Sequence, residues 1–137
     1  MIKTWWFAAV MLVGCSGDPD VDATGTVTLE MTYGAGTCQK TGSEPFTLHL
    51  AKTDAGSYEI MPSSVGETIG GDVACDAEAC QIEVFKQWTD ADFTSFEVHA
   101  SLTLDGNDNS VTGTGTFSSV GTSTSCEQQL TFAGVLQ

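Results

Sequence analysis

The sequence contains no arginine and only four lysines against 18 aspartates and glutamates, so its formal net charge is −14. Such a chain repels phosphate backbones, and it has few of the cationic clamps that phosphoryl-transfer sites use. We therefore expect no nucleic-acid partner and no phosphoryl chemistry. The acidic residues are scattered rather than collected in a block, which favours a solvated surface and leaves open a cationic protein of the cell envelope as a partner.

Long apolar runs and helical periodicity are also missing. The longest uncharged apolar stretch runs from Thr4 to Gly14. Its roughly 11 residues are too few for a membrane-spanning helix, which needs about 20. The stretch follows Lys3 and suits the hydrophobic region of an export signal.

The apolar stretch ends in Leu12-Val13-Gly14-Cys15, which resembles the lipobox of bacterial prolipoproteins. The resemblance covers residues 1–15 and implies cleavage before Cys15, which then carries the lipid. Two or three acyl chains hold a protein stably on a membrane, whereas one gives only marginal binding. An ordinary cleaved signal with an incidental cysteine is the alternative.

The resemblance also implies a location and a division of the chain. Ser16, which follows the lipidated cysteine, resembles an outer-membrane sorting signal, so we expect anchorage there, on the periplasmic or surface face, rather than in the inner membrane. Residues 1–14 are then the signal peptide. Residues 15–24, which include one Gly, one Pro and three Asp, form the lipidated cysteine and a flexible acidic tether. Residues 25–137 form a single β domain.

Period-two alternation of apolar and polar residues begins at Gly25 and predicts half-buried strands throughout the domain. About eight strands joined mostly by short loops predict an all-β fold, either an antiparallel eight-stranded up-and-down barrel or a β-sandwich. We favour the barrel, which is lipocalin-like in outline only. The predicted strands centre on Val27–Tyr33, Phe46–Leu50, Tyr58–Ile60, Val73–Cys75, Ile82–Trp88, Phe96–Leu104, Val111–Phe117 and Cys126–Leu136.

Two places break the alternation. The stretch from Ser63 to Gly71 contains three glycines and is predicted to be a loop. Lys86 falls on the apolar face that Ile82 and Trp88 share, and we expect a bulge or an edge position to account for it.

Four cysteines remain once Cys15 is set aside, and an even number in an exported domain predicts two disulfides. Three pairings are possible. We favour Cys75–Cys80, which would close a hairpin end, with Cys38–Cys126 joining the first and last parts of the domain. A zinc site or a reactive thiol is the alternative, but paired Cys-x-x-Cys knuckles are absent.

Residues with catalytic chemistry are few. His49 and His99 are the only histidines, and both fall on the polar face of their strands. We therefore predict no enzyme activity, no cofactor and no metal. The oxygen-rich segment Asp105–Asn109 is predicted to be a hairpin turn, with a weak calcium site as the alternative.

Gly113 and Gly115 fall on the inward face of their strand by parity. Their missing side chains could be filled by a large neighbour, could allow curvature, or could leave room for a small apolar ligand. The candidate cavity residues are Trp88, Phe96, Gly113, Gly115 and Phe117. Function is expected to be that of a lipid-anchored interaction or structural module, with a small-ligand carrier as the alternative.

Overall fold

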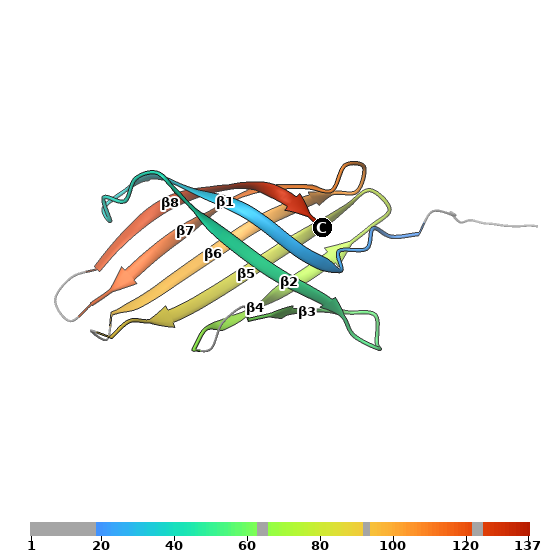
Figure 1. Ribbon diagram of the computed structural model, residues 1–137, viewed down its shortest axis with the longest axis horizontal. Coiled ribbons are helices and arrows are strands. Elements are labelled where there is room, and N and C mark those ends of the chain that lie inside the picture. The colour runs from blue at the N-terminus through green and yellow to red at the C-terminus, as the bar shows by residue number, and fades with distance from the viewer. Residues whose placement is uncertain (1–18, 63–65, 92–93, 122–124) are drawn as a thin grey trace, which may run out of the picture.

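The computed structural model describes residues 19–62, 66–91, 94–121 and 125–137, in which eight strands form one antiparallel sheet. The sheet has the order β3-β2-β1-β8-β7-β6-β5-β4, so β1 pairs with β8 and the sheet curls into a nearly closed barrel (Figure 1). The up-and-down barrel predicted from the alternation is thereby confirmed. The strands are β1 Gly25–Gly36, β2 Ser43–Lys52, β3 Tyr58–Met61, β4 Thr68–Cys75, β5 Ala79–Thr89, β6 Ser95–Asp105, β7 Ser110–Val120 and β8 Ser125–Leu136.

Alternating side chains build the core, because successive residues of a strand point to opposite faces. On β1, Val27, Leu29 and Met31 are buried, whereas Thr28 and Glu30 between them are exposed. The same alternation on the other long strands fills the barrel with aliphatic side chains. The threonines on the outer face suit strands, in which β-branched residues are favoured.

The barrel is incompletely closed at a seam between β3 and β4, the two edges of the sheet. β3 has only four residues and pairs with His49–Lys52 of β2, so residues 43–48 of β2 extend beyond it. Ile60 of β3 packs across the seam, with its Cδ1 3.1 Å from the position that a Cβ on Gly71 of β4 would occupy. Side-chain packing therefore joins β3 and β4, between which no β-ladder is described.

Both irregularities expected from the sequence turn out differently. The predicted loop from Ser63 to Gly71 is wrong at its end, because β4 begins at Thr68 and its glycines pair with β5. The bulge or edge position expected at Lys86 is also wrong. β5 lies between β4 and β6, and its register with both is continuous. Lys86 therefore points into the barrel.

Two disulfides staple the barrel, with the pairing favoured from the sequence. Cys75 and Cys80 face each other at the end of the β4–β5 hairpin. Cys38, in the β1–β2 connection, is bonded to Cys126 near the start of β8. The second bond spans 88 residues of chain, so it fixes the first part of the domain against the last.

The segment before β1 packs against one end of the barrel. The Val21 N–H donates to the Asp76 carbonyl at 2.7 Å, and the Ala23 N–H donates to the Tyr58 hydroxyl at 3.0 Å. Ala23 is fully buried. The flexible tether was expected to run to Thr24, but residues 21–24 are held to the barrel by these contacts. The signal peptide, Cys15 and Ser16 lie outside the described residues.

Candidate functional site at the aromatic end of the barrel

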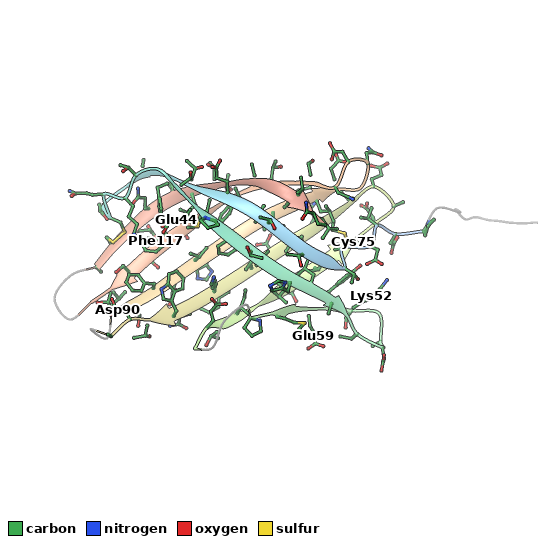
Figure 2. The ribbon with its side chains drawn as sticks, in the orientation of Figure 1. Glu44, Lys52, Glu59, Cys75, Asp90 and Phe117 are labelled. Atoms are coloured by element: carbon green, nitrogen blue, oxygen red, sulfur yellow. A yellow bond between two sulfur atoms is a disulfide. The ribbon has the colours of Figure 1, made fainter. Side chains whose placement is uncertain are left out.

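The two ends of the barrel differ in what covers them. One end is covered by residues 19–24, and we call it the strap end. The β2–β3, β4–β5 and β6–β7 turns and the C-terminus lie at this end (Figure 1). The β1–β2 connection and the C-terminal ends of β5 and β7 lie at the other end. Lys52 and Cys75 mark the strap end in Figure 2, whereas Glu44 and Phe117 lie toward the opposite end.

Three of the predicted cavity residues meet at that opposite end. The rings of Trp88 and Phe96 are stacked, with centroids 5.4 Å apart. The Phe117 centroid lies 6.4 Å from that of Trp88 and 6.0 Å from that of Phe96. Phe117 is buried, but Trp88 and Phe96 are only half-buried, so part of the cluster is exposed at this end of the barrel.

Gly113 and Gly115, the other two predicted cavity residues, have a different surrounding. A Cβ on Gly113 would lie 2.1 Å from the Ser101 carbonyl oxygen, and one on Gly115 would lie 2.1 Å from the His99 carbonyl oxygen. The backbone of β6 therefore occupies the space beside both glycines. So close an approach of the neighbouring backbone requires glycine, as in a curved strand. Curvature was one of the roles that the sequence analysis considered for these two glycines.

Two lysines, which the sequence analysis did not include among the site residues, extend the aromatic cluster. The Lys40 ammonium lies 5.3 Å from the Phe117 centroid and 5.4 Å from the Tyr33 centroid. The Lys86 ammonium lies 5.1 Å from the Phe46 centroid and 5.7 Å from the Trp88 centroid. Ammonium groups at such distances are attracted to the ring quadrupole. We call this set the aromatic mouth: Tyr33, Lys40, Phe46, Lys86, Trp88, Phe96 and Phe117.

Lys86 is unusual because its charge lies inside the wall of the barrel. Its side chain is 17% exposed, and its Nζ lies 3.2 Å from Oε2 of Glu67, which is 10% exposed. Lysine is rarely buried unless it is paired, and an ion pair taken out of water gains little net stability. Fold stability alone is therefore a weak explanation for a lysine here. In the sequence, Lys86 falls on the same strand face as Trp88, which indicates an inward position, but a bulge or an edge position was expected there instead.

Gln128, a buried polar residue on β8, holds the β1–β2 connection that carries Lys40. The Gln128 side-chain amide donates to the carbonyls of Gly34 and Lys40 at 2.8 and 2.6 Å, and its oxygen accepts from the Lys40 N–H at 3.0 Å. The Cys38–Cys126 disulfide holds the same connection. The backbone of Lys40 is thus preorganised, and its exposed ammonium is presented at the mouth.

Tyr33 and Glu44 complete the rim next to Lys40. The Tyr33 hydroxyl donates a hydrogen bond to the Glu44 carboxylate. Burial raises the pKa of the Tyr33 phenol above its ordinary value, and the hydrogen bond to Glu44 raises that pKa further. Tyr33 therefore stays neutral at physiological pH and holds the Glu44 carboxylate at the rim.

The other sequence candidates lie away from the mouth and are engaged locally. His49 of β2 contacts Thr26 at 3.2 Å, whereas His99 of β6 lies 3.4 Å from Glu97 and packs on Phe85. His99 also lines a shallow groove of about 410 Å³ across the outside of β4 to β8. The two histidines thus lie on strands that are not neighbours in the sheet.

The predicted turn at Asp105–Asn109 is confirmed as the β6–β7 hairpin. Asp105 and Asp108 each accept a hydrogen bond from a backbone N–H two residues along the chain, and Asn109 has φ 61°. Hydrogen bonds from Ser110 lower the pKa of Asp108 below its ordinary value. Among the described residues, no three His, Cys, Asp or Glu side chains are grouped to hold a metal ion.

Comparison with family models, curated proteins and solved structures gives no match for this chain. Within the part of the chain that the structure describes, no helix is long and apolar enough to cross a membrane. The class of protein is therefore defined by its fold, an eight-stranded disulfide-stapled barrel with an aromatic mouth at one end.

Proposed function

We propose that this protein is a lipid-anchored, non-enzymatic binding module of the bacterial cell envelope, which carries a small and largely apolar ligand at its aromatic mouth. The observation that carries the proposal is the cluster of Trp88, Phe96 and Phe117, in which two half-buried rings pack beside a buried one toward one end of the barrel. Ligand sites are concave and mainly apolar, with a few placed polar groups, and they occur in the mouths of β-barrels. The cluster has this composition.

The place of the anchor supports the same function. The lipobox resemblance puts the acyl chains on Cys15, only six residues before Val21, which is bound to the strap end. Six residues span at most about 22 Å. A lipid on Cys15 therefore holds the strap end near the membrane, here taken as the outer membrane, and leaves the aromatic mouth to face away from it, where a ligand can enter.

A second candidate function is the docking of a cationic envelope protein on the outside of the barrel. Every lysine of the described chain lies over an aromatic ring: Lys40 and Lys86 at the mouth, and Lys52 at 5.7 Å from the Tyr58 centroid. The outward rows of the strands carry exposed carboxylates, among them Glu30, Glu83 and Glu127. Such a surface steers cationic partners by its field.

Mass spectrometry of the full-length protein, produced in a bacterium and extracted from its membranes in mild detergent, tests anchorage and binding together. We expect the denatured, non-reduced mass to show loss of residues 1–14, acylation of Cys15 and a deficit of four hydrogens for two disulfides. The native mass should exceed the denatured mass by a few hundred daltons of ligand. An unacylated chain would contradict the anchor, and equal masses would favour the protein-docking candidate.

A further inference from the structure

The aromatic mouth carries lysines, which are scarce in this acidic chain. Only three lysines occur between residues 19 and 137, and two of them, Lys40 and Lys86, are at this one opening. Two carboxylates lie beside them, Glu67 on Lys86 and Glu44 on Tyr33, so within the described residues the positive charge of the mouth that makes no ion pair is that of Lys40.

The two ammonium groups differ in how well they are already neutralised. Lys86 is held by Glu67 inside the wall. Within the described residues, the Lys40 ammonium contacts the rings of Tyr33 and Phe117 and makes no ion pair or side-chain hydrogen bond. Its backbone is nevertheless fixed by Gln128. Lys40 thus offers an exposed, positioned positive charge without an anionic partner of its own.

An apolar surface adjoins this charge. Phe117 contacts both Lys40 and the stacked pair of Trp88 and Phe96. One molecule lying on the mouth can therefore place a charged group on Lys40 and an apolar body on the rings of Trp88 and Phe96. The acidic surface opposes the approach of an anion, but salt at physiological strength screens exposed charges beyond about 8 Å, so the adjacent lysine dominates at contact.

We infer that the aromatic mouth selects amphipathic anions, meaning molecules with one carboxylate or phosphate group on an apolar body. The inference rests on the proposed function and specifies its ligand class. The anionic group binds the Lys40 ammonium, while the apolar body packs on Trp88 and Phe96. The Lys40 ammonium repels a cationic head group at the same place, whereas Lys86 is already paired with Glu67.

The experiment uses Ser16–Gln137, because all eight strands and both disulfides lie within it. Trp88 is its only tryptophan, since Trp5 and Trp6 precede Ser16, and so the fluorescence of this chain reports directly on the mouth. Decanoate, decyl phosphate, 1-decanol and decyltrimethylammonium are titrated below their micelle concentrations. Lys40→Gln removes the exposed charge, and Lys52→Gln is the matched control at the strap end.

We expect decanoate or decyl phosphate to change the Trp88 emission with saturation and to bind at least about tenfold more tightly than 1-decanol. Comparison of the two anions shows whether carboxylate or phosphate is preferred. Decyltrimethylammonium should bind more weakly than 1-decanol. Lys40→Gln should abolish the advantage of the anions over 1-decanol, whereas Lys52→Gln should preserve it.

Equal affinities for the anions, the alcohol and the cation would overturn the inference while leaving a mouth that binds apolar ligands. An anion preference that survives Lys40→Gln would overturn it as well. No change in Trp88 emission with any of the four compounds would instead contradict the proposed function itself.

Discussion

Replacing Cys38 and Cys126 together by alanine should lower the free energy of unfolding by about 5 kcal/mol. The bond joins residues 88 apart, and on the chain-entropy model a crosslink destabilises the unfolded state more when the loop it closes is longer. Domains of this size are stable by only about 5–15 kcal/mol, so the variant would retain little of its fold at 37 °C. Urea unfolding followed by far-ultraviolet circular dichroism measures the change.

The Cys75–Cys80 bond provides the matched control for that prediction. Its cysteines are 5 residues apart, for which the same model gives about 2 kcal/mol. Replacing both of these cysteines by alanine should therefore cost less than half as much as removing Cys38–Cys126. Equal losses for the two double variants would show that loop closure does not explain how the disulfides stabilise this barrel.

Gly113→Ala should destabilise the barrel by about 3 kcal/mol or more, which is at the upper end of the cost of overpacking. The new Cβ would lie 2.1 Å from the Ser101 carbonyl oxygen and 2.9 Å from the Leu102 Cα, both of them backbone atoms of β6. A side chain cannot rotate away to relieve this contact, so the β6–β7 ladder must move. Thermal and urea unfolding of the purified variant measure the loss.

Gly70→Ala is the control for Gly113→Ala, because Gly70 also lies within a strand. A Cβ on Gly70 would meet no atom within 4 Å, and its φ is not in the left-handed region. The free energy of unfolding should therefore change by less than about 0.5 kcal/mol. If Gly113→Ala were equally harmless, the close approach of β6 would not be the reason for glycine on β7.

The fold was largely predictable from the sequence because its determinants are local. Val27, Leu29 and Met31 alternate with polar residues, and each long strand repeats that pattern. The even number of cysteines after Cys15 and the short Cys75–Cys80 spacing led to the correct disulfide pairing. Parity also placed Trp88, Phe96 and Phe117 inside the barrel, and the structure brings these three rings together.

What the sequence could not provide depends on contacts between distant segments. Lys86 breaks the apolar pattern, and its inward direction follows only from the continuous register of β5 and from its ion pair with Glu67. Gln128 looks like any polar residue of a strand until the β1–β2 connection folds over it. Lys40 lies in that connection, where the strand periodicity does not apply. The sequence pattern therefore did not indicate that its ammonium contacts Phe117.

Binding of the neutral dye Nile red to Ser16–Gln137 tests the central claim, that the aromatic mouth is the ligand site, most directly. Trp88 and Phe85 lie on the same strand, but Trp88 stacks on Phe96 at the mouth whereas Phe85 packs on His99 at the outer face. We predict saturable binding of one dye, weakened at least about tenfold by Trp88→Ala and unchanged by Phe85→Ala. Binding that survives Trp88→Ala, or that Phe85→Ala weakens equally, would contradict a ligand site at the aromatic mouth.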